Sequence, residues 1–142
     1  MTGRERANRN IIGRRGITTT FEDINENYEF GKFRDVEVII EKESGYMNIT
    51  KICRDVRIKY GLDKKLSNWK RTSRGRIMLE EVSEMKDVPC DELLIRPTGL
   101  PEELRGTYAH PSIAPFIAMW ASPIFSIGVF QIARERQVSK SI

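Results

Sequence analysis

Residues 45–61 read GYMNITKICRDVRIKYG, and this stretch predicts the central helix of the fold. Its apolar side chains recur at the spacing i, i+3, i+4, i+7 and i+11, which gathers them on one face of an α-helix. They are Ile49, Ile52, Cys53, Val56 and Tyr60. Asn48 before them is a favourable N-cap, and Gly61 after them is a favourable terminator. The basic side chains Lys51, Arg54, Arg57 and Lys59 lie off this face, toward water or a ligand.

The next segment, residues 62–74, is short and strongly basic and predicts a second helix. Leu66 and Trp69 lie three residues apart, so both can face a core. The opposite face then collects Ser67, Lys70, Arg71 and Arg74. Two helices joined by a turn at residues 61–65, the second with cations on its outer face, are typical of a helix-turn-helix. Gly75 is expected to break this helical pattern.

The charge of the chain is unevenly distributed. The net charge is only +4, with a sequence pI of about 9.2. Residues 51–76 nevertheless contain ten basic and two acidic residues, whereas the flanking segments 17–50 and 77–105 each contain three basic and eight acidic residues. A strong positive field over one segment favours a polyanionic partner. Charge alone leaves a solvated basic surface equally open.

Strands are predicted on both sides of this region. Residues 33–40 alternate in the manner of a pleated strand, a turn follows at residues 43–45, and Tyr46 and Met47 return beside the strand. Farther along, residues 93–96 and 106–108 are expected to pair around the loop 97–105. Such a hairpin would form a wing beside the helix-turn-helix.

Further helices complete the expected core. Met78, Val82 and Met85 recur at i, i+4 and i+7 and predict a helix with acids on its outer side. The apolar stretch from 111 to about 136 is divided by Ser122 and Pro123, which suit an N-cap and the first position of a new helix. These two helices fit a protein core better than a membrane span. The expected fold class is α+β, a compact helix-rich domain with small β-hairpins, similar to a winged helix-turn-helix.

Residues 1–20 are expected to form a flexible basic N-terminal arm, followed by one folded domain over residues 21–142. The arm is rich in Arg, Asn, Gly and Thr and has almost no core-forming residues. Three roles stay open for it: a disordered tail, a contact along a phosphate backbone, or a nuclear import signal. Because no apolar signal segment follows the basic start, the protein is expected to be intracellular, in the nucleus or cytoplasm, rather than secreted.

Catalysis, metal binding and a cofactor are not expected. Two cysteines and one histidine do not supply the roughly four closely spaced ligands of a zinc site. Cys53 lies on the apolar helix face and is expected to be an inert core residue. His110, before Pro111, is interpreted as a helix-start residue whose ring caps or packs. No GxxxxGK[ST] loop is present for a nucleotide.

Three sequence blocks resemble those of one known family. Residues 45–53 (GYMNITKIC) are similar to the opening motif of the KilA-N domain, and residues 66–71 (LSNWKR) to its "SNW" helix. Residues 106–111 (GTYAHP), 114–115 and 120–125 (WASPIF) resemble its closing motif. The family is typical of large DNA viruses and phages and resembles the fungal APSES DNA-binding domains. The resemblance implies a compact α+β domain of winged helix-turn-helix type that binds DNA.

The expected function is non-catalytic binding of double-stranded DNA, dominated by phosphate contacts with modest sequence readout. Lys70, Arg71 and Arg74 would meet phosphates or guanine edges in the major groove. Asn68 would either read adenine or satisfy a backbone group, and Trp69 is expected in the core. The full set of expected DNA-binding residues is Lys51, Arg54, Lys64, Lys65, Ser67, Asn68, Lys70, Arg71, Arg74 and Arg76.

Two alternatives stay open. Single-stranded DNA or RNA binding would require exposed aromatic side chains along the basic groove, where Tyr60 and Trp69 are the candidates. A protein-interaction or homodimerisation module would instead use the exposed part of the apolar C-terminal helices. Some viral relatives carry a C-terminal RING domain and act as ubiquitin ligases, but no Cys/His ligand set of that kind follows here, so ligase activity is not expected.

Overall fold

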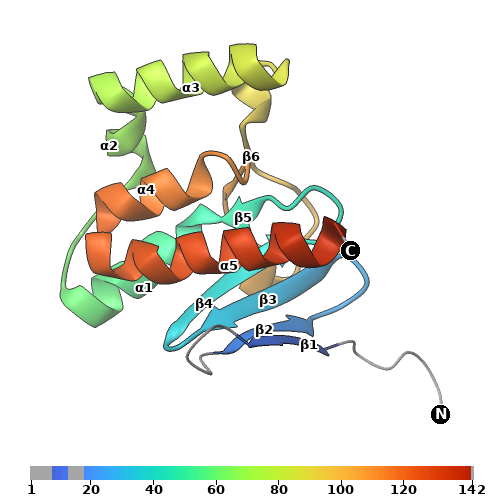
Figure 1. Ribbon diagram of the computed structural model, residues 1–142. Coiled ribbons are helices and arrows are strands. Elements are labelled where there is room, and N and C mark those ends of the chain that lie inside the picture. The colour runs from blue at the N-terminus through green and yellow to red at the C-terminus, as the bar shows by residue number, and fades with distance from the viewer. Residues whose placement is uncertain (1–7, 13–17, 142) are drawn as a thin grey trace.

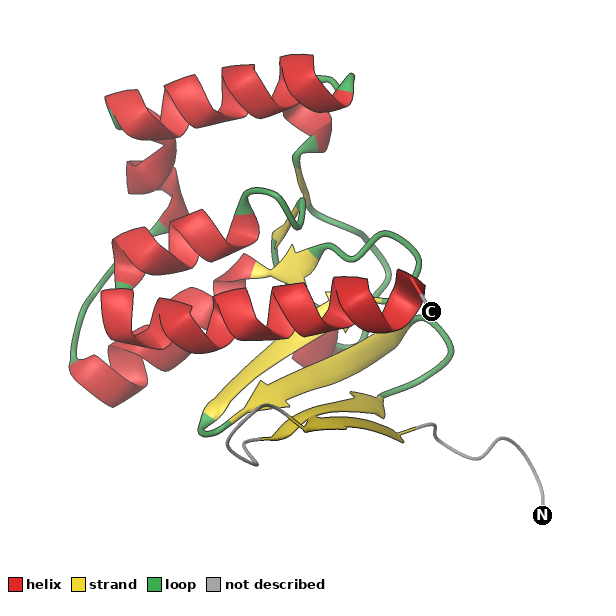
Figure 2. Ribbon diagram, in the orientation of Figure 1, coloured by secondary structure: helices red, strands yellow, loops and turns green. Residues whose placement is uncertain are grey.

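The computed structural model describes residues 8–12 and 18–141, which form one antiparallel sheet and a set of helices (Figures 1 and 2). The strands are β1 (Asn8–Ile12), β2 (Thr18–Asp23), β3 (Tyr28–Phe33), β4 (Val36–Glu41), β5 (Met47–Asn48), β6 (Leu94–Ile95) and β7 (Tyr108–Ala109). The helices are α1 (Ile49–Tyr60), α2 (Leu66–Arg71), α3 (Ser73–Lys86), α4 (Ala114–Ala121) and α5 (Pro123–Ser141). Short 3-10 turns occur at Cys90–Glu92 and Glu102–Leu104. The order of strands in the sheet is β1-β2-β3-β4-β5-β7-β6.

The predicted α+β class is confirmed, because helices and an antiparallel sheet share one core. Helix α5 packs on β2, β3 and β4, and α1 packs against β4 and α4 (Figure 1). Apolar side chains fill the space between these layers, for example Val38, Ile52 and Phe125, each at most 2% exposed. A smaller apolar cluster contains Tyr28 and Tyr108, whose rings lie 5.6 Å apart.

Helix α1 has both of its predicted ends. The side chain of Asn48 accepts a hydrogen bond from the backbone N–H of Lys51 at 2.9 Å. At the other end Gly61 adopts the left-handed conformation, with φ at 68°, and its N–H donates to the Arg57 carbonyl. A residue without Cβ enters this conformation at no steric cost, which is why the helix ends here.

The predicted strand over residues 33–40 is in fact divided. Strand β3 ends at Phe33, Arg34 has a positive φ of 55°, and β4 begins at Val36. Phe33 pairs with Val36 across the resulting turn, so the two strands form a hairpin. The apolar alternation continues through this turn, which explains why the pattern alone does not reveal it.

The flexible arm expected over residues 1–20 is corrected where the structure describes it. Asn8–Ile12 pairs with β2, which begins at Thr18, so both segments belong to the sheet. Backbone hydrogen bonds supply this pairing, and they require little apolar patterning. Residues 1–7 and 13–17 of the expected arm lie outside the described residues.

Strands β2 and β3 are not apparent from the sequence. In β3, the inward face breaks the apolar alternation. Glu29 is fully buried there, paired with Arg9 at 3.1 Å and Arg136 at 3.0 Å. Gly31 provides room for α5, since a Cβ at this position would lie 2.5 Å from Cγ2 of Ile132. An acid and a glycine thus occupy positions where a strand pattern is expected to show large apolar residues.

The other strand pairings and the division of the C-terminal helices hold in outline. Met47 pairs with Ile40, and β6 pairs with β7 as a hairpin that joins the main sheet through β5. The apolar C-terminal stretch is divided as expected, since the Ser122 hydroxyl accepts from the N–H of Phe125 at 3.2 Å and α5 begins at Pro123. Within the described ranges, no helix has the length and apolar character needed to cross a membrane.

Candidate nucleic-acid interface

Helices α2 and α3 project from the body of the domain, beyond α4 on the side away from the sheet (Figure 1). The chain reaches them from the end of α1 through the loop 61–65. The predicted second helix is present as α2, but it ends at Arg71. Arg74 therefore does not share a helical face with Ser67, Lys70 and Arg71 as expected, and lies on α3 instead. Thr72 separates it from α3.

Trp69 anchors α2 to the body and is 4% exposed, as expected of a core residue. Thr72 then starts α3, because its hydroxyl donates to the Trp69 carbonyl at 2.7 Å and accepts from the Gly75 N–H at 2.9 Å. The prediction that Gly75 breaks the helix is wrong, since Gly75 lies in the first turn of α3. A Cβ at this position would lie 2.1 Å from the Trp69 carbonyl oxygen, so the α2–α3 junction requires a glycine here.

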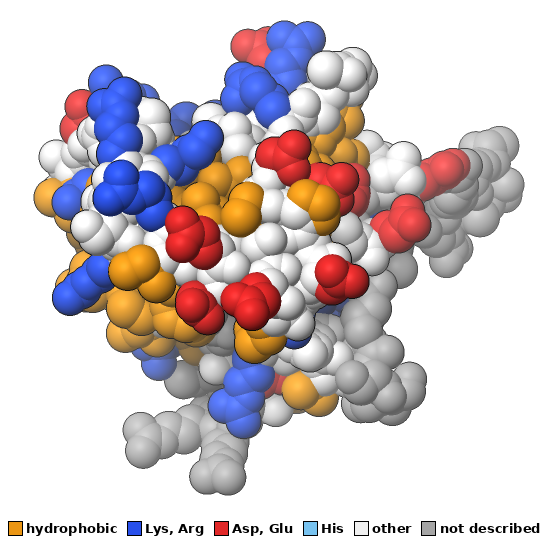
Figure 3. All heavy atoms as spheres, turned by 90° about the horizontal axis from the view of Figure 1, so that it is seen from above, with side chains coloured by type: hydrophobic (Ala, Val, Ile, Leu, Met, Phe, Trp, Pro, Cys, Tyr) orange, Lys and Arg blue, Asp and Glu red, His pale blue; other side chains and the backbone are white. Residues whose placement is uncertain are grey.

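Trp69 is turned inward, and the polar side chains of α2 and of the first turn of α3 are exposed. We call this surface the basic face; it consists of Ser67, Asn68, Lys70, Arg71, Arg74 and Arg76. Figure 3 shows Lys and Arg side chains gathered over the N-terminal end of α3. All six residues of this face belong to the set expected to bind DNA.

A second group of cations lines a groove of about 340 Å³ beside α1 and α2, which we call the α1–α2 groove. Its charged lining residues are Arg54, Arg57, Lys64, Lys65 and one acid, Asp63. Nζ of Lys64 lies 5.0 Å from the ring centroid of Trp120, a cation–π contact between the loop and α4. Arg57 was not assigned to the site from the sequence, although its place off the apolar face of α1 is a signal that could have found it.

The cations of the basic face and the α1–α2 groove share one property: none forms an ion pair with any residue that the structure describes. By contrast Lys59, also on α1, pairs with Asp35. Cations without ion pairs are the groups that can exchange counterions for phosphate oxygens without first breaking an internal salt bridge.

Lys51, which was expected among the DNA-binding residues, has a different environment. Its Nζ lies 2.6 Å from Oδ2 of Asp55 and 3.4 Å from Oε1 of Glu37, and it donates to the Glu37 carbonyl at 2.9 Å. The side chain is only 12% exposed. The structure therefore separates Lys51 from the two groups of unpaired cations.

Helix α3 changes charge along its length. Its first turn carries Arg74 and Arg76, while its second half carries exposed acids at Glu80, Glu81 and Glu84. Figure 3 shows Asp and Glu side chains beyond the basic end of this helix. The positive surface is thus bounded on one side by a negative one.

Two residues that could suggest catalysis have structural surroundings. Nδ1 of His110 accepts the N–H of Ser112 at 2.9 Å, and the ring packs edge-on against Tyr46, so the expected packing role is confirmed. His110 does not itself start a helix, because α4 begins at Ala114 with Ile113 as its N-cap. Burial, and secondarily the charge of Lys86, lower the pKa of His110. Burial raises the pKa of the Cys53 thiol to about 11, as suits a packed residue. The described residues contain no group of three or more His, Cys, Asp or Glu side chains placed to hold a metal ion.

The model of the KilA-N domain family matches residues 31–137. A putative KilA-N domain-containing protein of Acanthamoeba polyphaga mimivirus, R878, is 41% identical over 109 residues, covering 76% of this chain and 30% of that protein. Another from the same virus, L33, is 31% identical over 118 residues, covering 83% and 48%. A fowlpox virus protein, FPV236, is 27% identical over 128 residues, covering 89% and 42%.

The chain therefore spans between 30% and 48% of the length of these relatives. No solved structure matches it.

Proposed function

The chain belongs to the KilA-N domain family, which is generally associated with DNA binding, and we propose that it binds double-stranded DNA without catalysis. The basic face would enter the major groove, and the α1–α2 groove would hold the neighbouring phosphates. The observation that carries this proposal is the grouping of solvated cations without internal ion pairs on α2, the start of α3 and the adjoining loop.

Sequence readout would come from the exposed side chains of α2. Arg71 can bind O6 and N7 of guanine with two hydrogen bonds, and Asn68 can bind N6 and N7 of adenine. Both residues are exposed, and the buried side chain of Trp69 on the same helix fixes the orientation of α2. Because α2 has only six residues, it presents few base contacts, and readout would be modest. The β6–β7 hairpin would serve as the wing.

Affinity would come mainly from phosphates. Arg54, Arg57 and Lys65 supply positive charge on one side of α2, and Arg74 and Arg76 supply it on the other. Each phosphate that such a cation neutralises releases counterions, so binding should weaken steeply as salt rises.

The burial of aromatic side chains near the basic face favours a duplex over a single strand as the ligand. Stacking platforms for unpaired bases need exposed rings. Trp69 is buried, and Tyr60, at 36% exposed, is the remaining candidate near the basic surface that was identified from the sequence. Trp120 is partly buried and in contact with Lys64.

Fluorescence anisotropy with a labelled random duplex and the matching single strand, each across a salt series, tests the proposal. A log–log slope of roughly −4 to −6 for the duplex would correspond to about five to seven neutralised phosphates. Combined replacement Lys70→Gln, Arg71→Gln and Arg74→Gln should flatten this slope by about two, through the two phosphate contacts, and abolish binding at physiological salt.

The matched control removes the same charge elsewhere, through Arg34→Gln, Lys86→Gln and Arg134→Gln, and should retain most of the affinity. Tighter binding of the single strand would favour the single-strand alternative. Absence of binding to either probe at low salt would contradict a nucleic-acid function and direct attention to the exposed apolar residues Phe116, Met119, Ile124 and Ile127 on α4 and α5.

A further inference from the structure

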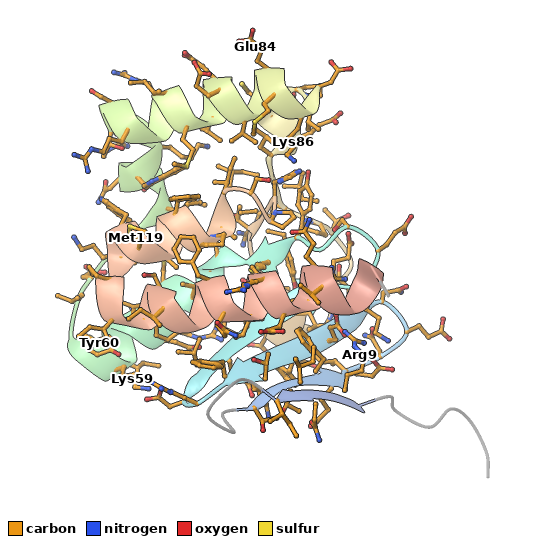
Figure 4. The ribbon with its side chains drawn as sticks, in the orientation of Figure 1. Arg9, Lys59, Tyr60, Glu84, Lys86 and Met119 are labelled. Carbon is orange, nitrogen blue, oxygen red and sulfur yellow. The ribbon has the colours of Figure 1, made fainter. Side chains whose placement is uncertain are left out.

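A second and larger groove lies at the opposite end of α3 from the basic face. It has a volume of about 570 Å³, within the usual range of small-molecule sites. The end of α3, the loop at residues 110–112, the start of α4 and residues 130–137 of α5 all contribute to its lining. Figure 4 shows Lys86 at this end of α3 and Glu84 pointing away from the body of the domain. We call it the C-terminal groove.

One wall of the C-terminal groove is aromatic. Phe116 on α4 and Phe130 on α5 meet edge to face, with ring centroids 5.2 Å apart. Phe116 remains 41% exposed, although most apolar residues of α4 are buried. An exposed ring held in a fixed orientation by a second ring is a surface on which an apolar or planar group can pack.

The polar lining of the groove supplies hydrogen-bond donors and positive charge. Lys86 and Arg134 line it, and neither forms an ion pair with a described residue. Arg136 also lines it but is held by Glu29 at 3.0 Å and by the carbonyl of Lys42. The described lining contains no Asp or Glu. The second half of α3, which ends at Lys86, carries acids, but none of them lines the groove.

His110 completes the donor set. Since its Nδ1 accepts the Ser112 N–H, the neutral ring carries its proton on Nε2. Lys86 is close enough to disfavour the charged ring electrostatically. An anion placed near Lys86 and His110 would accept a hydrogen bond from Nε2 and be attracted by the charge of Lys86.

From this arrangement we propose that the C-terminal groove binds a small organic anion, one that joins a carboxylate or phosphate to an apolar, preferably aromatic, group. The anionic part would lie against Lys86, Arg134 and His110, and the apolar part against Phe116 and Phe130.

This site is distinct from the proposed DNA interface. Helix α3 has 14 residues and is about 20 Å long, so its two ends are well separated. The basic face and the α1–α2 groove together hold eight cations without ion pairs to described residues, which suit a phosphate backbone. The C-terminal groove combines fewer cations with an aromatic wall, which a phosphate backbone would not use.

Nuclear magnetic resonance of the His110 ring tests the proposal, because the chain contains a single histidine and so gives one ring signal. The probes are phenyl phosphate, benzoate, benzamide and inorganic phosphate. Phenyl phosphate or benzoate should shift the signal saturably, with a Kd on the order of 1–10 mM for ligands of this size. Benzamide, which lacks the charge, and inorganic phosphate, which lacks the ring, should bind at least several-fold more weakly.

The variants Lys86→Gln and Arg134→Gln should each weaken phenyl phosphate or benzoate binding about threefold or more, and Phe116→Ala should do the same without removing charge. Lys64→Gln in the α1–α2 groove is the matched control and should leave the titration unchanged. Equal responses to phenyl phosphate and inorganic phosphate, an unsaturable response to every probe, or an equal effect of Lys64→Gln would each overturn the proposal. The preference between phenyl phosphate and benzoate identifies the anionic group.

Discussion

At the scale of single residues, ion pairing separates cations that the helical pattern treats alike. Lys51 and Arg54 both lie off the apolar face of α1, three residues apart. Lys51 is held between Asp55 and Glu37 and is 12% exposed, whereas Arg54 is exposed beside the α1–α2 groove. The first side chain therefore contributes to packing of α1 on β4, and the second is available to a ligand.

We expect Lys51→Met to lower the free energy of unfolding by about 1 kcal/mol, as for a partly exposed ion pair, and to change duplex affinity less than about twofold. Arg54→Met should leave stability nearly unchanged and weaken duplex binding several-fold, because one phosphate contact is lost. Urea denaturation and anisotropy measure the two effects. A large loss of affinity in Lys51→Met without unfolding would show that its ion pairs open when DNA binds.

The two thiols should differ in reactivity. Burial raises the pKa of Cys53 to about 11, so its reactive thiolate is scarce at neutral pH, whereas Cys90 is exposed. A disulfide reagent should modify one thiol rapidly in the folded protein and both after denaturation, and peptide mapping should locate the rapid label at Cys90. Raising the pH toward 11 should accelerate modification of Cys53. Fast labelling of both thiols at neutral pH would indicate that the packed face of α1 opens readily.

At the scale of elements, α3 is the helix that sets the boundary of the positive surface. Its first turn extends the basic face, and its second half carries three exposed acids, Glu80, Glu81 and Glu84. A duplex that followed the helix along its whole length would meet these acids. The charge pattern therefore favours a duplex that crosses the N-terminal end of α3.

Neutralising this acidic half should tighten DNA binding. Combined Glu80→Gln, Glu81→Gln and Glu84→Gln should raise affinity for a random duplex about threefold or more at low salt, and the gain should shrink as salt screens the repulsion. The control Glu43→Gln, Glu102→Gln and Glu103→Gln changes the net charge equally at other exposed positions. If both triple variants raised affinity to the same extent, net charge rather than the position of the α3 acids would be responsible.

At the scale of the whole molecule, one buried carboxylate joins three segments that are far apart in the sequence. Glu29 on β3 is fully buried and pairs with Arg9 on β1 and Arg136 on α5. It thus ties the edge of the sheet and the C-terminal helix to the centre of the fold. Removing one member of such a group leaves buried charge without its partner.

Glu29→Gln should therefore lower the free energy of unfolding by about 3–5 kcal/mol. The control Glu22→Gln, on the neighbouring strand β2, should cost much less, because no ion pair of Glu22 is among those found in the described structure. Equilibrium urea denaturation of both variants makes the comparison. A cost below about 1 kcal/mol for Glu29→Gln would mean that the ion group contributes little to the fold.

The sequence by itself determined the features that are encoded within a few turns of chain. The periodicity from Ile49, the cap at Asn48 and the stop at Gly61 define α1, and the spacing of Leu66 and Trp69 orients α2. Ser122 and Pro123 divide the C-terminal helices in the same local manner. These signals depend on neighbours in the chain, so they can be read without the fold, and the motifs they contain also identified the family.

Only the tertiary structure decided the features that depend on distant partners. Gly31 and Glu29 obscure β3 as a sequence pattern because Ile132 and Arg136, on α5, pack against them. Gly75 lies at the start of a helix rather than ending one, because the Trp69 carbonyl oxygen occupies the place that a Cβ would take. A contact with a distant residue also distinguishes Lys51 from the unpaired cations, because Lys51 pairs with Glu37 on β4. Exposure and pairing arise from contacts between segments, and composition does not record which segments meet.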